Sequence, residues 1–308
     1  MTRFIHRHPR GIALVLALLA GAVSLPASAA DGLQFSTGAD YSSGDFGGAT
    51  QTEVLVVPIS ARLRVGNWSL RGTLPYLRIS GPADVIVIAD DSSGSSSGSG
   101  GSSSSGSGRS GGSGSSGSGG GGSDDSVSGD GSDDRGGNDA FSAGRRVSGL
   151  GDATLSLTRS FNALGDTAFY ADVTGRVKFA TGKASSGLGV GTTDYSAGTE
   201  LGYAGEAAGL YAAVARRFLG STASLQREDG WQWHAGGWVN VGTAVEVGTV
   251  YSWREASTPM GINSRDVEVN LGLHLGTDWR ATLFASRGLS DGSPEMAGGL
   301  NLSWQYGL

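Results

Sequence analysis

Apolar and polar residues alternate along most of the chain after residue 30. From Val267 to Leu275 every odd position holds valine or leucine, and the even positions hold Glu268, Asn270, Gly272 and His274. Residues 167–180 and 296–308 show the same period of two. Successive side chains of a β-strand point to opposite faces. The pattern therefore predicts strands with one apolar and one polar face.

Runs of this kind recur along the whole chain outside one low-complexity tract. Each run has roughly the 9–11 residues that a tilted strand needs to cross a bilayer. Twelve runs are found, at 33–42, 52–64, 68–79, 152–161, 167–180, 193–204, 209–219, 230–241, 244–255, 265–275, 279–287 and 296–308. The expected fold class is therefore all-β, a transmembrane antiparallel up-and-down β-barrel of about 12 strands.

The connections between the runs support this fold because short and long ones alternate strictly. The short connections are 65–67, 162–166, 205–208, 242–243 and 276–278. The long connections are 43–51, 80–151, 181–192, 220–229, 256–264 and 288–295. Outer-membrane barrels have tight periplasmic turns and longer external loops. An even number of strands also returns both termini to the periplasm.

The aromatic residues separate a membrane barrel from a soluble sandwich, which would also show alternation. On the apolar face they gather at the two ends of the runs, and small aliphatic residues lie between them. Those at the short-turn ends are Trp68, Phe161, Tyr203, Trp279, Trp304 and Tyr306; those at the long-loop ends are Tyr41, Tyr76, Phe179, Tyr195, Trp231, Trp233, Tyr251 and Trp253. Two such girdles are typical of a barrel that crosses a membrane.

The first thirty residues predict export. Arg3, Arg7 and Arg10 precede an apolar run at 12–23, and Ala27-Ser28-Ala29 provides small residues for cleavage. This is the layout of a secretory signal. We therefore expect a signal peptide at 1–30, a barrel at 31–308 and a bacterial outer-membrane location. There is no cysteine for a disulfide, a thiolate site or a lipid anchor.

A low-complexity segment at 85–146 is inserted within the predicted barrel. Its centre, 91–139, consists almost entirely of Ser, Gly and Asp. Such a composition cannot bury enough apolar surface to offset the loss of chain entropy, so we expect a disordered external loop. The aspartates of the tract lack the regular spacing of a calcium loop.

Charged and histidine side chains fall on the polar, inward face. The candidate pore-lining residues are Asp40, Arg62, Arg64, Arg71, Asp172, Arg176, Lys178, Glu200, His234, Glu246, Arg254, Glu268, His274 and Arg280. Eight-stranded barrels are filled by side chains, whereas sixteen strands leave a channel. A twelve-stranded barrel lies between these limits, so the lumen is either a narrow pore, which we favour, or closed.

Several segments resemble a family of outer-membrane β-barrels named for the phenol-degradation meta-pathway. They are residues 37–45, Val57-Pro58, Leu74-Pro75-Tyr76, Gly149-Leu150-Gly151-Asp152 and Val177-Lys178-Phe179-Ala180-Thr181-Gly182. The last of these resembles a Val-Lys-Leu-Pro-Thr-Gly motif, with Phe and Ala at its third and fourth positions. The resemblance covers about residues 37–220 and implies a barrel that passes or binds small, often aromatic, molecules.

Two functional hypotheses follow. The first is an outer-membrane channel for small, aromatic or apolar molecules, which pass passively through a charged narrow lumen. The second is a structural or surface-display barrel with a closed lumen and an acidic flexible external loop. We expect no enzyme, because His234 and His274, the two histidines that follow the predicted signal peptide, both point inward and not toward lipid, where a hydrolase barrel would place its nucleophile pair. We expect no catalytic residues, cofactor or metal site.

The expected partners follow from the same hypothesis. They are outer-membrane lipid and lipopolysaccharide, the barrel-assembly machinery and small-molecule solutes. Of Arg216 and Arg217, only one can face outward toward lipopolysaccharide phosphates, because adjacent residues of a strand point in opposite directions. A net charge of −6 and the lack of a basic stripe argue against nucleic acid. No outward strand face is distinctive enough to suggest an oligomer, so we expect a monomer.

Overall fold

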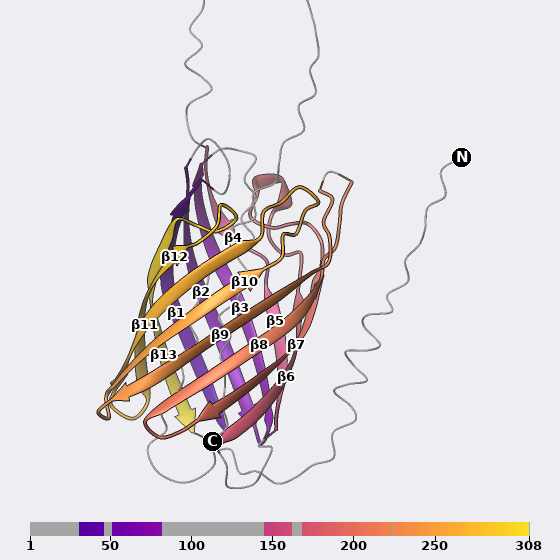
Figure 1. The fold of residues 1–308 in the computed structure, drawn as a ribbon. Coiled ribbons are helices and arrows are strands. Elements are labelled where there is room, and N and C mark those ends of the chain that lie inside the picture. The colour runs from indigo at the N-terminus through magenta and orange to yellow at the C-terminus, as the bar shows by residue number, and fades with distance from the viewer. Residues whose placement is uncertain (1–30, 46–50, 82–144, 162–167, 224, 308) are drawn as a thin grey trace, which may run out of the picture.

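The computed structural model describes all residues except 1–30, 46–50, 82–144, 162–167, 224 and 308 (Figure 1). The predicted signal peptide and the centre of the Ser/Gly/Asp tract therefore lie outside the described residues. The strands are β1 (Gly32–Gly44), β2 (Thr52–Val65), β3 (Trp68–Gly81), β4 (Arg145–Leu150), β5 (Thr154–Phe161), β6 (Phe169–Lys178), β7 (Asp194–Ala204), β8 (Ala208–Phe218), β9 (Gly230–Val241), β10 (Val245–Arg254), β11 (Ser264–Leu275), β12 (Trp279–Gly288) and β13 (Met296–Gly307). One short 3₁₀ helix, η1 (Ala184–Ser186), lies between β6 and β7.

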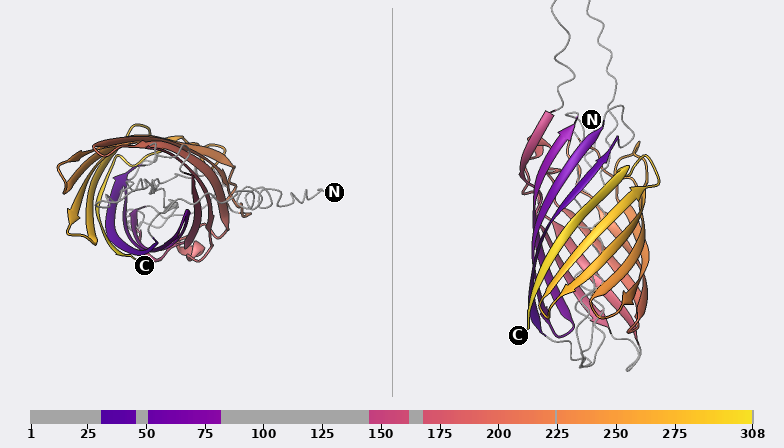
Figure 2. Two further views of the ribbon diagram at one scale, coloured as in Figure 1. Left: turned by 90° about the horizontal axis from the view of Figure 1, so that it is seen from below. Right: turned by 90° about the vertical axis from the view of Figure 1, so that its left-hand side faces the viewer.

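The strands form one antiparallel sheet that closes on itself through the pairing of β1 with β13. Seen along its axis, the sheet is a ring (Figure 2, left). β4 and β5 both pair with β3, one beyond the other, so together they occupy one strand position. The molecule is therefore a closed antiparallel barrel of twelve strands, which confirms the predicted fold.

The strand bounds agree with the twelve predicted runs to within a few residues, with one exception. The connection predicted at 80–151 ends earlier, because Arg145–Leu150 forms β4. This segment gave no strand signal because its outward positions include Arg146 and Ser148, which are polar and exposed. The low-complexity segment predicted at 85–146 therefore overlaps the first two residues of β4.

The short β2–β3, β7–β8, β9–β10 and β11–β12 turns cluster at one end of the barrel, and the longer β6–β7, β10–β11 and β12–β13 connections lie at the other end (Figure 1). Three of the short turns contain a glycine with positive φ, namely Gly66 (53°), Gly242 (71°) and Gly276 (81°). Glycine has no Cβ and adopts this left-handed conformation without steric cost, which makes such tight turns possible. Among the described residues, no helix has the length and apolar character needed to cross a membrane.

The outer surface of the barrel is apolar in its middle and aromatic at both ends. Ile59 and Val269 are more than half exposed near the middle of their strands. At the short-turn end Phe35 stacks on Trp304 with ring centroids 6.1 Å apart, and at the long-loop end Trp233 and Tyr251 are 5.2 Å apart. A soluble protein would bury these side chains, so the exterior is suited to lipid.

Arg159 is an exception on the outer face, and aromatic rings shield it. Its guanidinium lies 4.9 Å from the centroid of Trp68 and 5.7 Å from that of Phe161. Trp68 and Phe161 belong to the short-turn girdle, and Arg159 is the register partner of Trp68. Stacking on aromatic faces stabilises a cation at such an interface.

The interior is mostly polar, but it also contains apolar clusters that the alternation did not predict. Val54, Val56, Leu77 and Ile79 point inward from β2 and β3 and pack with Leu188 of the β6–β7 connection. These residues lie toward the long-loop ends of their strands. The cluster fills that side of the lumen.

Inward-facing aromatic residues lie against glycines on the neighbouring strand. In four cases the aromatic residue and the glycine are direct register partners: Tyr170 with Gly202, Tyr211 with Gly236, Trp238 with Gly209, and Phe284 with Gly299. A Cβ at any of these glycines would lie within 2.7 Å of the aromatic side chain. The glycines therefore provide the space that lets large rings lie flat along the inner wall.

Candidate functional site

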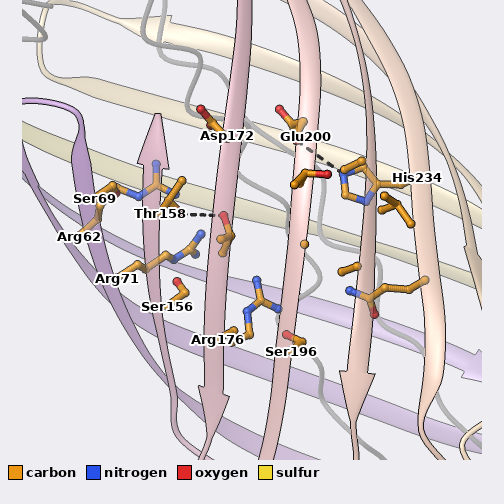
Figure 3. Close-up of a pocket in the computed structure, with 17 residues that line it drawn as sticks. Arg62, Ser69, Arg71, Ser156, Thr158, Asp172, Arg176, Ser196, Glu200 and His234 are labelled. Carbon is orange, nitrogen blue, oxygen red and sulfur yellow. Dashed lines mark hydrogen bonds and ion pairs between the residues drawn. The ribbon is translucent and has the colours of Figure 1, made fainter. Parts of the chain in front are cut away.

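The main cavity inside the barrel has a volume of about 110 Å³ and is lined by residues of β2, β3 and β5 to β9 (Figure 3). Six of the predicted pore-lining residues meet there: Arg62, Arg71, Asp172, Arg176, Glu200 and His234. They come from β2, β3, β6, β7 and β9, which lie within one continuous stretch of the sheet. Barrel closure brings them together.

The acidic side of the cavity is organised around Glu200. Tyr170 donates a hydrogen bond of 2.7 Å from its hydroxyl to Oε1 of Glu200. The Nε2 atom of His234 lies 3.8 Å from Oε2 of the same carboxylate (Figure 3), and the ring of His234 packs edge-on to Tyr211. Glu200 therefore already has partners on both of its oxygens.

The basic side of the cavity consists of arginines separated by hydroxyl groups. Arg71 donates from Nη2 to the Ser60 hydroxyl over 3.3 Å. The hydroxyls of Thr158 and Thr174 are 2.9 Å apart and link β5 to β6 (Figure 3). Guanidinium groups and hydroxyls together offer hydrogen-bond donors to water or to a solute oxygen.

A second, smaller cavity of about 30 Å³ continues toward the long-loop end and shares Arg176, Ser196 and Gln232 with the first. Its centre is Asp194, whose two oxygens lie 2.7 Å from Lys178 Nζ and 2.7 Å from Arg227 Nη1. Arg227 belongs to the connection between β8 and β9 and also donates to the carbonyl of Gly220 in the same connection. Its contact with Asp194 therefore ties this connection to the inner wall. All three charged side chains are buried.

The opposite inner wall carries a separate ion pair. Arg280 donates from Nη2 to Oε1 of Glu246 over 2.8 Å, and its Nη1 lies 3.3 Å from Nε2 of His274. Of the remaining predicted residues, Lys178 lines the second cavity. Seven lie outside both cavities: Asp40, Arg64, Glu246, Arg254, Glu268, His274 and Arg280.

Sequence reasoning missed three kinds of residue around these cavities. The hydroxyl residues, such as Thr158 and Ser196, have the inward parity but no distinctive chemistry. Asp194 lies at the very start of a strand, where alternation is a weak signal. Arg227 belongs to a long connection, and only its buried contact with Asp194 reveals its position.

Three segments that carry the family resemblance meet at the interruption between β4 and β5. Thr181 donates from Oγ1 to the carbonyl of Gly151 and accepts from the amide of Ala153, over 3.1 and 2.7 Å. Asp152 accepts from the amide of Gly182 over 2.9 Å, and the amide of Gly151 donates to the carbonyl of Pro75. The motifs therefore form one structural unit that fixes the start of the β6–β7 connection.

The same connection is held at its other end by Asp152, whose second oxygen accepts from the amide of Val190 over 3.2 Å. Leu188, two residues earlier, fills the apolar cluster on β2 and β3. The aspartate of the Gly-Leu-Gly-Asp motif thus positions a segment that narrows the long-loop end of the lumen.

The chemistry of the site is that of a charged, hydroxyl-lined surface. Within the described ranges, no group of three histidine, aspartate or glutamate side chains is arranged to hold a metal ion. The side chains can exchange hydrogen bonds and charge interactions with water and small polar solutes.

Comparison with known proteins identifies the fold. No protein-family model matches the chain, and neither does any curated protein sequence. Among solved structures, an outer membrane channel from Pseudomonas putida F1 matches with a TM-score of 0.56 and 11% identity, over 92% of this chain and 100% of that one. A structure described as KdgM porin matches with a TM-score of 0.45 and 5% identity, over 89% and 99%. The similarity to the outer membrane channel concerns the fold.

Proposed function

We propose that this protein is a passive channel of the bacterial outer membrane, through which small molecules pass along a narrow, charged lumen. The observation that carries the proposal is the pair of contiguous cavities inside a closed barrel with an apolar exterior. Their lining is polar and charged, which suits water and solutes rather than a packed core. The similarity in fold to an outer membrane channel supports the proposal.

The predicted pore-lining residues acquire a role in this proposal. Arg62, Arg71 and Arg176 border the solute path on one side, and Asp172 and Glu200 border it on another. The ion pair of Glu246 and Arg280 lies on the opposite inner wall, outside both cavities. The family resemblance in sequence adds small aromatic molecules as candidate solutes.

We also propose that the lipid partner includes lipopolysaccharide. Arg216 faces outward at the long-loop end, with its guanidinium 5.3 Å from the ring centroid of Trp231. Arg217, by contrast, is buried on the inner side. A cation at the level of the outer aromatic girdle meets the phosphate groups of that lipid. Insertion by the barrel-assembly machinery and a monomeric state complete the proposal.

Solute influx into proteoliposomes tests the channel directly. Liposomes that contain the refolded protein should swell in small neutral solutes without an energy source, and the rate should fall steeply with solute size. Ala213 lines the main cavity, whereas Ala212 points to lipid. Ala213→Trp should slow influx severalfold, and Ala212→Trp should not. A fully folded wild-type protein that gives no influx would favour the structural barrel with a closed lumen.

A further inference from the structure

Four inward arginines lie in a single row across the strands of the barrel. Arg62 of β2 is the register partner of Arg71 on β3, and Arg71 is the partner of Ser156 on β5. The row then runs from Ser156 to Arg176 on β6, to Ser196 on β7 and to Arg217 on β8. We call Arg62, Arg71, Arg176 and Arg217, with the two serines between them, the arginine track.

The arginine track climbs along the barrel axis from the short-turn end toward the long-loop end. A row of register partners is perpendicular to the strands, and the strands of a barrel are tilted, so the row climbs along the barrel axis. Arg62 lies near the short-turn end of β2, whereas Arg217 lies next to the last residue of β8 at the long-loop end. Strands are spaced by about 4.8 Å, so Arg71, Arg176 and Arg217 follow one another at steps of about 10 Å.

The surroundings of the track are predominantly cationic. Six cationic side chains line the two cavities: Arg62, Arg71, Arg176, Lys178, Arg217 and Arg227. Three carboxylates accompany them: Asp172, Asp194 and Glu200. Asp194 is shared between Lys178 and Arg227, and Glu200 is engaged by Tyr170 and His234. The track itself contains no carboxylate.

Serine and threonine hydroxyls fill the space between the guanidinium groups. Ser156 and Ser196 alternate with the arginines in the track, and Thr158 and Thr174 form the next row toward the short-turn end. The apolar side chains that line the main cavity are Ala213, Val214 and Ala215 of β8, and none of them belongs to the track. A hydrocarbon that covered this surface would displace water from its polar groups without replacing their hydrogen bonds. An anion, by contrast, would accept hydrogen bonds from its many donors.

We propose that the arginine track guides small organic carboxylates through the lumen. A planar guanidinium binds a carboxylate through two parallel hydrogen bonds, and successive arginines allow the anion to pass from one to the next. This inference rests on the proposed channel function and narrows its solute class. An aromatic solute would then pass because of its carboxylate, and an uncharged ring of the same size would not be favoured.

Zero-current potentials across planar bilayers test the proposal, with the full chain in a potassium chloride gradient and then in a potassium benzoate gradient at pH 7. The wild-type protein should favour each anion over potassium. The variant R71Q/R176Q should lose about threefold in anion preference for each charge removed, since a unit charge several ångströms away in water changes local ion concentration by that order. R78Q/R287Q removes two outward-facing arginines and should keep the wild-type preference.

Two further experiments make the outcomes decisive. R71K/R176K keeps the charge and should restore chloride preference while only partly restoring benzoate preference, because lysine lacks the planar fork. The part of liposome influx that depends on the protein, after subtraction of influx into protein-free liposomes, should be larger for benzoate than for benzyl alcohol, which has the same ring without the carboxylate. A current without anion preference, or equal loss in R71Q/R176Q and R78Q/R287Q, would overturn the arginine track and leave the channel intact. The absence of any current from folded protein would overturn the channel itself.

Discussion

The indole ring of Trp238 lies against Gly209, its register partner on β8, so closely that a Cβ at residue 209 would be 2.5 Å from the indole nitrogen. Trp238 is buried inside the barrel although it belongs to a strand whose other two tryptophans face lipid. Because Gly209 on β8 has no side chain, there is space for the indole ring of Trp238 on β9 at this position.

Replacement of Gly209 should destabilise the barrel. In Gly209→Val the new side chain overlaps the indole, and forced overpacking of this kind costs about 1–3 kcal/mol. The temperature at which the folded, fast-migrating gel band converts to the unfolded form should fall. Gly72→Val is the matched control, because a Cβ at Gly72 meets only a Leu155 methyl group at 3.9 Å. Equal melting of the two variants would mean that the contact contributes nothing.

The direction of the side chains can be tested at two adjacent alanines in the middle of β8. Ala212 is exposed on the outer face, and Ala213 lines the cavity between Glu200 and His234. An arginine on the lipid face near mid-membrane costs about 2–4 kcal/mol because hydrocarbon cannot solvate the charge. Ala212→Arg should therefore impair folding into lipid vesicles, whereas Ala213→Arg should fold.

A stronger folding defect for Ala213→Arg would reverse the assignment of the two faces. Refolding yield in vesicles, followed by heat-modifiable gel mobility, measures both variants under the same conditions.

The alternation of apolar and polar residues predicts which side chains face outward and which face inward. It does so because lipid favours apolar side chains and the lumen favours polar ones at successive positions of a strand. It predicted the twelve strand positions and the two girdles for the same reason. It did not predict the apolar cluster of Val54, Leu77 and Leu188, since an inward valine has the same local pattern as an outward one. Burial there depends on the β6–β7 connection, which is distant in sequence.

The site was predictable in composition but not in arrangement. Arg62, Arg71 and Arg176 could be assigned to the inner face by parity alone. The alignment of these three arginines in one row depends on the register of three strand pairs, and a shift of two residues in any pair would break the row while the alternation stayed unchanged. Arg227 lies outside any strand, so no periodic signal marks it.

Removal of the carboxylate of Asp194 should release the β8–β9 connection. Asp194→Asn leaves Lys178 and Arg227 buried without their shared counter-charge, and loss of one partner of a buried pair costs about 3–5 kcal/mol. Limited proteolysis of the folded variant should cut faster between residues 219 and 229.

The matched control for this prediction is Glu255→Gln. The carboxylate of Glu255 lies 3.9 Å from Arg216 on a partly exposed surface, where an ion pair contributes at most about 1 kcal/mol. Cleavage of Asp194→Asn no faster than that of Glu255→Gln would show that the buried triad does not hold the connection.

The Ser/Gly/Asp tract at 91–139 should be dispensable for folding and accessible from outside the cell. It belongs to a long connection, and a flexible loop changes stability by only about 0.6 kcal/mol for each doubling of its length. Its deletion should leave heat-modifiable mobility unchanged, and protease added to intact cells should cleave the wild-type chain there first. Cleavage only after permeabilisation would place the long connections in the periplasm.

Single-channel conductance of the refolded wild-type protein in a planar bilayer tests the central claim most directly. If the contiguous cavities inside the barrel form a water-filled path, insertion of each molecule should produce a discrete current step whose size grows with salt concentration. Ala213→Trp should reduce the step, because its side chain enters the main cavity. Protein that inserts with full heat-modifiable mobility and gives no current steps at any salt concentration would contradict the channel.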